Sequence, residues 1–563
     1  ADRAAVLIDG AAYFAAVRAA LLKARRSVFI LGWDIDSRCR LVGPDRAPDD
    51  GFPVAFADFL SALVRERPEL TVHLLLWDYS VVYALERELF PTLSLHWTTP
   101  RQVRLCLDDE LPLGSAHHQK LIVVDDAVAF CGGLDLAIRR WDTPDHTPDN
   151  PARIDPAGNP YRPFHDVQTL VDGDAAHALA ELARARWAQA SADAADDIPP
   201  DDKESGSDPW PDGVAPDLYG IDAGIARTLP VYGGHPEVRE VEALFCDAIA
   251  SAERHVYIEN QFVTCTRVAE ALARRLRERP NLEAVIVGPQ RYASWIEWRT
   301  MRNGRIAFRE AMERAGVADR VRLLYPEVRQ RDAVTDTMIH SKVCIVDDRL
   351  LRVGSANLNH RSMGTDTECD VAFAASTAGH RRGIAAVQAR LLADHCGVAP
   401  AQAEAHLAAT KSLIRTAETL SGNGHRLLPI DDGAPDPEDI SSAIRELADP
   451  DHALAPELSI GGVRTRLSRM QVSTLAKIGI GTLLLFALPL AWQWTSLSQF
   501  ASPEAVRNTL LRITDGPWTP VAVIAVYVAA GLVAFPVTVL IAGSGATFGP
   551  FTGTAYAAAG ALT

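Results

Sequence analysis

The chain has 563 residues, a length that allows several domains at about 150 residues each. Its hydrophobic content of 48% and charged content of 23% are those of an ordinary globular chain, and its net charge of −16 argues against a protein that coats nucleic acid. The eight cysteines form neither a CxxC pair nor a zinc-ligand spacing, so we expect reduced thiols.

Segments of similar pattern follow one another in the same order in two halves of residues 1–415. Each half has an amphipathic helix that runs into a short strand, then an apolar strand, and finally a strand that turns from polar to apolar. This order predicts a duplicated α/β unit, in which each copy is a mixed sheet flanked by helices and the copies meet around a pseudo-twofold axis. The segments are 16–36, 70–78 and 164–173 in the first half, and 244–264, 282–290 and 367–376 in the second.

A basic motif, His-x-Lys-x-x-x-x-Asp, stands before the last strand of each half. It reads HQKLIVVD at 118–125 and HSKVCIVD at 340–347. The chain has 16 His and only six Lys, so two chance matches are expected about 0.0001 times. A small pair and a polar side chain follow each motif. The residues are His118, Lys120, Asp125, Gly132, Gly133 and Asp135 in the first copy, and His340, Lys342, Asp347, Gly354, Ser355 and Asn357 in the second.

The motif has the groups for chemistry at a phosphodiester. A histidine in a cleft can attack phosphorus or act as a general acid or base. A lysine two residues further along a strand points to the same face and can hold a phosphate oxygen. Two copies would let one histidine attack phosphorus while the other protonates the leaving alcohol and later activates water or a new alcohol. Because the lysines neutralise charge, we expect neither a metal nor another cofactor.

The doubled motif followed by Gly-Gly or Gly-Ser resembles the signature of the phospholipase D superfamily over most of residues 1–415. Asp135 stands where the shorter superfamily pattern has Asn, a change that the lipid-acting branch often shows. Four longer words are similar to the phosphatidylcholine-type branch: GGLDLAIRRWD at 132–142, PFHDV at 163–167, VYIENQF at 256–262 and NHRSMGTDTE at 359–368.

This resemblance implies a role for each site residue. His118 would be the nucleophile and His340 the general acid/base, although the symmetry of the sequence alone leaves their order open. Asp166 and Glu368 occupy matching places in the two closing strands and are the expected partners of the histidines. Asp125 and Asp347 complete the catalytic motifs, with a structural role. The groups expected at the phosphate are Lys120, Lys342, Gly133, Asp135, Ser355 and Asn357.

Two long apolar runs predict an α-helical membrane region at the end of the chain. Residues 478–502 and 516–563 carry no charge and exceed the roughly 20 residues that a spanning helix needs. Basic residues precede the first run, which predicts a cytoplasmic catalytic body on a multi-pass protein of the cell (inner) membrane. The Gly- and Pro-rich end predicts a re-entrant segment. Residues 535–563 resemble the start of a VTT-type domain (SNARE-associated, related to DedA), incomplete here, which implies a lipid-handling membrane module.

Acidic, Pro-rich stretches set the predicted domain boundaries. They separate two phospholipase D lobes from each other and from the membrane region. The predicted ranges are 1–192 for the first lobe, 193–230 for a linker, 231–415 for the second lobe, 416–473 for a second linker and 474–563 for the transmembrane region.

The leading interpretation is a membrane-anchored phospholipase D or transphosphatidylase. It would release phosphatidic acid from a glycerophospholipid, with water or an alcohol as acceptor and no nucleic-acid partner. A cardiolipin synthase-like phosphatidyltransferase is one alternative. A nuclease of the same superfamily is another, disfavoured by the acidic balance and the lipid-branch words. A lipid-transport membrane protein with a vestigial hydrolase half is the last, and the two intact motifs argue against it.

Overall fold

The computed structural model divides the chain into two compact units, Ala1–Gly462 and Val463–Thr563. In the first unit it describes residues 1–43, 48–78, 95, 98–191, 208–232, 234–292, 295–434, 448–453 and 455–459. In the second it describes residues 519, 523–524, 526–527, 544, 547–549 and 552.

The first unit contains two large mixed sheets. The first sheet has the order β10-β1-β9-β7-β6-β2-β3-β4, in which β2, β3 and β4 run parallel and the other pairs are antiparallel. Its buried strands are short and rich in Val, Leu and Ile, as expected for a sheet covered on both faces. Its strands are β1 (Arg3–Ile8), β2 (Ser27–Gly32), β3 (Thr71–Trp77), β4 (Val103–Asp108), β6 (Leu121–Val124), β7 (Val128–Gly132), β9 (Val167–Asp172) and β10 (Leu218–Tyr219).

The second sheet repeats this topology. Its order is β12-β11-β20-β19-β18-β13-β14-β15-β16, with β21 also paired to β15 and with β13, β14 and β15 parallel. Strand β18 therefore corresponds to β6, and β20 to β9. Its strands are β11 (Asp222–Leu229), β12 (Val238–Arg239), β13 (His255–Asn260), β14 (Glu283–Val287), β15 (Val321–Gln330), β16 (Ala333–Asp336), β18 (Lys342–Val346), β19 (Leu350–Gly354), β20 (Glu368–Ala374) and β21 (His425–Pro429).

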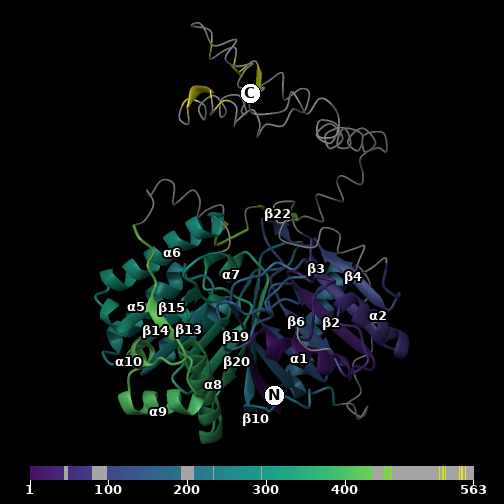
Figure 1. Ribbon diagram of the computed structural model, residues 1–563, viewed down its shortest axis with the longest axis horizontal. Coiled ribbons are helices and arrows are strands. Elements are labelled where there is room, and N and C mark those ends of the chain that lie inside the picture. Colours follow the sequence, from purple (N-terminus) through teal and green to yellow (C-terminus); the bar gives the residue numbers. More distant parts are fainter. Residues whose placement is uncertain are drawn as a thin grey trace. The chain divides into compact units, whose positions relative to one another are not determined.

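Helices cover these sheets, and the predicted mixed α/β fold is confirmed. One core cluster joins the facing sides of both sheets with α3 and α8, and two further clusters fill the outer faces. Figure 1 shows α2 and α5 at opposite ends of this arrangement. The helices are α1 (Asp9–Leu21), α2 (Phe56–Glu66), α3 (Gly173–Ser191), α4 (Glu240–Ser251), α5 (Thr266–Glu278), α6 (Trp295–Arg314), α7 (His360–Gly364), α8 (Ala378–Cys396), α9 (Pro400–Thr410) and α10 (Leu413–Thr419).

Both predicted linkers contain regular structure. Strands β10 and β11 lie within the range 193–230, and strand β21, which pairs with β15, lies within 416–473. The acidic, Pro-rich composition of these stretches is typical of linkers. It does not indicate the short strands, because their pairing partners are distant in sequence. Strand β11 pairs with β20 along seven residues, so the second lobe begins before residue 231.

Most of the predicted membrane region lies outside the described residues. Within the part of the chain that the structure does describe, no helix is both long enough and apolar enough to cross a membrane. In the second unit, the hydroxyl groups of Tyr527 and Ser544 form a buried hydrogen bond of 3.0 Å.

Candidate active site

Each motif histidine lies on a short segment just before its motif strand. This segment pairs with a segment of the other lobe. The short strands β17 (Met338–Ile339) and β8 (Phe164–His165) pair in parallel, and the His340 amide donates a 2.9 Å hydrogen bond to the His165 carbonyl. The relation is reciprocal, because the His118 amide donates to the Thr367 carbonyl at 3.1 Å. The chain crossing thus brings both motifs to one seam between the lobes.

The His118 ring contacts a carboxylate of the second lobe. Its Nδ1 lies 3.0 Å from both carboxylate oxygens of Glu368, the first residue of β20. The Ser355 hydroxyl donates to the same carboxylate, and the Gln119 side-chain amide donates to the Glu368 carbonyl at 3.2 Å. These contacts fix the imidazole orientation and leave Nε2 as the ring nitrogen for chemistry.

The His340 ring has the equivalent partner in the first lobe. Its Nδ1 lies 2.6 Å from Oδ2 of Asp166, and the other Asp166 oxygen accepts the Val167 amide at 2.8 Å. The ring also packs against Phe164, with centroids 5.3 Å apart. The guanidinium of Arg140 lies 4.9 Å from the centre of that Phe164 ring. A cation therefore stands close to His340, in addition to the motif lysines.

Both motif lysines are buried beside their histidines. Lys120 Nζ donates to the His118 carbonyl at 3.1 Å and lies 3.4 Å from an Asp135 oxygen. Lys342 Nζ donates to the side-chain oxygen of Gln261 at 3.1 Å and also to the His340 carbonyl. The two ammonium groups concentrate positive charge at the seam, which suits a phosphate anion.

The two imidazole rings are the accessible part of this constellation. The side chains of His118 and His340 are 16% and 13% exposed, whereas those of Glu368 and Asp166 are fully buried. A substrate can therefore reach the ring nitrogens while the carboxylates stay out of water.

Burial and mutual charge shift the pKa values of this group strongly. Burial, reinforced by Lys120 and Lys342, holds the pKa values of both histidines well below their usual range. Burial likewise raises the pKa of Asp166 to about 6 and that of Glu368 to about 7. The pKa of Lys342 is lowered to about 7, first by burial and then by Lys120. At neutral pH, unprotonated imidazoles are therefore favoured, as a nucleophile requires.

The residues expected at the phosphate divide into two kinds. Asp135 accepts the Trp33 amide at 2.9 Å and lies beside Lys120, while the Ser355 hydroxyl is committed to Glu368. A carboxylate repels a phosphate anion, so this geometry assigns Asp135 and Ser355 to positioning their neighbours rather than to phosphate contact.

Gly133 and Asn357 are placed differently. A Cβ on Gly133 would lie 2.4 Å from an Asp166 oxygen and 3.0 Å from the Lys342 side chain, so the backbone here closely approaches Asp166 of its own lobe and Lys342 of the second lobe. The Asn357 side-chain oxygen is buried without a hydrogen-bond partner among the described residues.

Asp125 and Asp347 are not brought to the histidines, although they belong to the predicted catalytic motifs. Each follows the far end of its motif strand and turns back onto the backbone that enters the neighbouring strand. The Asp125 carboxylate accepts hydrogen bonds from the backbone amides of residues 25–27, at 2.8 to 2.9 Å. The Asp347 carboxylate accepts hydrogen bonds from the backbone amides of residues 253–255, at 2.8 to 3.0 Å. Both residues have positive φ angles, of 50° and 55°. Their role in the structure is to tie strands together.

Two contributors were not predicted as site residues. Gln261, which accepts from Lys342, lies in the word VYIENQF, and its position after an apolar strand is the signal that could have indicated it. Arg140 lies in the word GGLDLAIRRWD, but its place near His340 depends on the fold.

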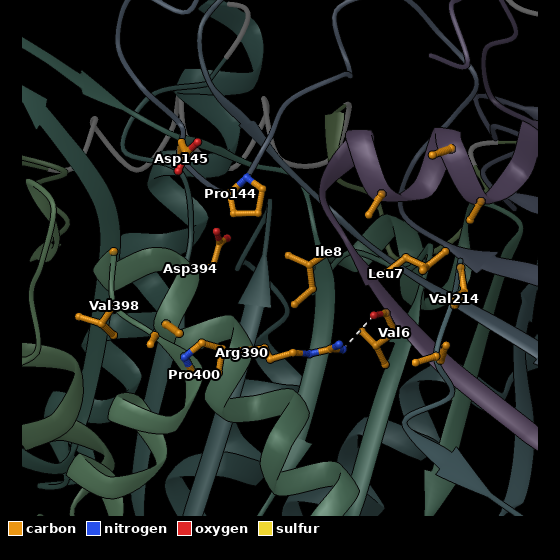
Figure 2. Close-up of a pocket in the computed structure, with 18 of the residues that line it drawn as sticks. Val6, Leu7, Ile8, Pro144, Asp145, Val214, Arg390, Asp394, Val398 and Pro400 are labelled. Atoms are coloured by element: carbon orange, nitrogen blue, oxygen red, sulfur yellow. Dashed lines mark hydrogen bonds between the residues drawn. The ribbon is translucent and has the colours of Figure 1, made fainter. Parts of the chain in front are cut away.

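A cavity is present elsewhere in the first unit. It has a volume of about 1020 Å³ and is lined by parts of α1, α8 and the segment around Asp145 (Figure 2). None of the described motif residues lines it. The cavity is therefore separate from the two-histidine site.

Comparisons with known proteins agree with this duplicated arrangement. The family model described as "Phospholipase D" matches residues 107–209, and the model described as "Cardiolipin synthase, PLD-like domain" matches residues 245–381. One match falls in each half of the chain, and each covers that half's motif. Each lobe thus matches a domain model of the phospholipase D type.

Individual relatives are similar at low identity. Phospholipase D A of Dictyostelium discoideum is 24% identical over 65% of this chain and 32% of its own length. Phospholipase D alpha 4 of Arabidopsis thaliana is 25% identical over 67% of this chain and 62% of its own length. A crystal structure of phosphatidylserine synthase from Haemophilus influenzae superposes with a TM-score of 0.45 at 12% identity, over 79% of this chain and 92% of that one. The chain spans less than two thirds of the length of these two phospholipases.

Proposed function

We propose that the first unit is a phospholipase D-type phosphodiesterase acting on glycerophospholipids. One observation carries this proposal: two histidines, each oriented by a carboxylate of the opposite lobe, stand beside two buried lysines at one seam. The phospholipase D relatives support the substrate class.

The proposed reaction is a double displacement. His118 Nε2 attacks phosphorus and forms an N–P bond while the P–O bond to the headgroup breaks. His340 gives its Nε2 proton to the departing oxygen, so the headgroup leaves as a neutral alcohol. His340 then takes a proton from water, whose oxygen attacks phosphorus as the N–P bond breaks. The products are phosphatidic acid and free His118.

The charges at the seam fit this sequence. In the free site, burial and then the charges of Lys342, Arg140 and Lys120 lower the pKa of His340, so its ring is mostly unprotonated and has no proton to donate. A bound phosphodiester anion offsets the lysine charges and raises the pKa of His340 again. Substrate binding would therefore protonate His340 before it must donate.

The proposal is tested by assaying headgroup release from phosphatidylcholine vesicles with His118→Ala and His340→Ala. We expect each variant to lose activity by at least about 10³-fold, because the histidines act in one sequence. The control is His452→Ala, which replaces an exposed histidine. Near-normal activity in either motif variant would refute a shared site. Trapping of a His118 peptide that carries a phosphatidyl group in the His340→Ala protein would support the assignment of the nucleophile.

A phosphatidyltransferase resembling cardiolipin synthase is the second candidate. The match of residues 245–381 to the cardiolipin synthase model favours it. The same residues would act, but a lipid alcohol would replace water as acceptor. Product analysis decides: phosphatidylglycerol alone would yield cardiolipin if transfer dominates, and phosphatidic acid if hydrolysis does.

We further propose that residues 474–563 form a multi-pass, VTT-like anchor that keeps the catalytic unit at the cytoplasmic side of the inner membrane. The uncharged runs 478–502 and 516–563 and the basic residues before them support this. Fusing reporters after residues 300 and 470 tests the orientation. Reporter activity outside the cytoplasm would contradict it.

A further inference from the structure

A cluster of four buried side chains lies outside the two-histidine site. It consists of Asp9 at the start of α1, His146 between β7 and β8, His165 in β8 and Asp394 in α8. Each is at most 7% exposed. One ligand-type atom from each lies within 4.8 Å of all the others.

The distances within the cluster match those between ligands of one small cation. His165 Nδ1 lies 2.9 Å from an Asp9 oxygen and 3.0 Å from an Asp394 oxygen. His146 Nε2 lies 3.6 Å and 3.5 Å from oxygens of the same two carboxylates. Tetrahedral zinc, with ligands about 2.0 to 2.1 Å away, separates neighbouring ligand atoms by about 3.3 Å.

The inner atoms of this cluster form no well-aligned hydrogen bond, although His165 Nδ1 lies at ion-pair distance from both carboxylates. Within the described part of the chain, His146 Nε2, His165 Nδ1 and all four oxygens of Asp9 and Asp394 are buried without a hydrogen-bond partner. Leaving so many buried polar atoms unpaired is costly. A cation placed among these atoms would satisfy them together.

The outer nitrogen of each histidine is held by a further carboxylate. His146 Nδ1 lies 2.9 Å from Asp142, and His165 Nε2 lies 2.9 Å from Glu259. A histidine that donates its other ring N–H to a carboxylate presents a lone pair at the inner nitrogen, as metal-ligating histidines do. Both inner nitrogens face the cluster.

The backbone at two members is also strained. Asp9 has φ of 68° and His146 has φ of 39°, conformations that cost free energy for residues with a side chain. The surrounding structure therefore holds both side chains in place against a local preference.

We propose that Asp9, His146, His165 and Asp394 bind one structural zinc ion that joins the two lobes. Two imidazole nitrogens and two carboxylate oxygens form a donor set that suits zinc. Three ligands come from the first lobe and Asp394 from the second. Because Asp166 follows His165, the ion would also fix the strand that presents Asp166 to His340.

The large cavity provides a path for the ion. Asp394 lines it, as do Ile8 and Asp145, the neighbours of Asp9 and His146. Figure 2 shows the Asp394 carboxylate on the cavity wall near Pro144 and Ile8. A hydrated cation could therefore reach the cluster from this side.

The test measures zinc by mass spectrometry in the purified full chain, carrying no polyhistidine tag, after loading with Zn²⁺ and removal of excess. We expect about one zinc per chain in the wild type and at least about a tenfold loss in His146→Gln and Asp394→Asn, since each removes a ligand. His380→Gln is the matched control, because His380 is a buried histidine of α8 outside the cluster. Zinc retained in both ligand variants would overturn the proposal.

Stability of the wild type gives an answer even where a variant fails to fold. Chelation should lower the melting temperature by about 5 °C, and Zn²⁺ should restore it, because a ligand of the native state stabilises that state. Cobalt in place of zinc should give the visible absorption of a tetrahedral site. Wild-type protein that binds neither ion refutes the site, whatever the outcome of the phosphodiesterase assays.

Discussion

His118 of the first lobe is hydrogen-bonded through Nδ1 to Glu368 of the second lobe, and His340 and Asp166 repeat this relation in the opposite direction. Each histidine-carboxylate pair is therefore built from both halves of the chain. Neither lobe by itself contains a motif histidine together with its carboxylate partner, so the site depends on the packing of the two lobes.

Replacing the carboxylate that contacts a motif histidine should slow the reaction with little effect on substrate binding. We expect Glu368→Gln to lower kcat about 10- to 100-fold with little change in KM, because the amide can still contact His118 but no longer stabilises its charged form. Steady-state kinetics of headgroup release measure this. The control is Glu418→Gln, which alters an exposed carboxylate paired with Arg322. Equal losses in both variants would contradict the prediction.

The same carboxylate should make stability depend on pH. Burial raises the pKa of Glu368 from 4.5 to about 7, so its native-state stabilisation is full below pH 4.5 and is lost as pH rises toward 7. Glu368→Gln removes this dependence. We expect its stability relative to wild type to increase by up to about 3 kcal/mol between pH 4.5 and 7. Denaturant unfolding across that range measures it, and a pH-independent difference would refute the assigned pKa.

Gly133 should tolerate no side chain. The Cβ of Gly133→Ala would meet an Asp166 oxygen at 2.4 Å, which must displace the partner of His340. We expect at least about a 100-fold loss of kcat/KM in the folded protein. Gly224→Ala in β11 is the matched control, since nothing lies within 4 Å of its added Cβ. If both variants kept wild-type activity, the close approach at Gly133 would have no catalytic consequence.

Asp125 and Asp347 should matter for stability rather than chemistry. Asp125→Asn leaves one acceptor oxygen for three backbone amides, so we expect a loss of about 1 to 3 kcal/mol in the free energy of unfolding. Asp347→Asn should behave alike. Chemical denaturation measures the loss, and kcat of the remaining folded protein should stay within about threefold of wild type. Abolished turnover at unchanged stability would show a direct catalytic role instead.

The sequence by itself determined the duplicated α/β architecture and the identity of the motif residues. Short apolar strands have a local pattern, and a doubled His-x-Lys spacing is rare enough to stand out wherever the strands lie. It also indicated Asp166 and Glu368, because they occupy equivalent places in the two closing strands.

The tertiary structure alone decided which carboxylate meets which histidine. The pairs lie 250 and 174 residues apart, and only the crossing of β17 beside β8 brings His340 to Asp166. The same holds for Asp9, His146, His165 and Asp394, which share no local spacing and converge through the packing of α8 on the first lobe. Local pattern reveals which groups a chain carries, but contacts between distant segments depend on how the lobes bury their surfaces together.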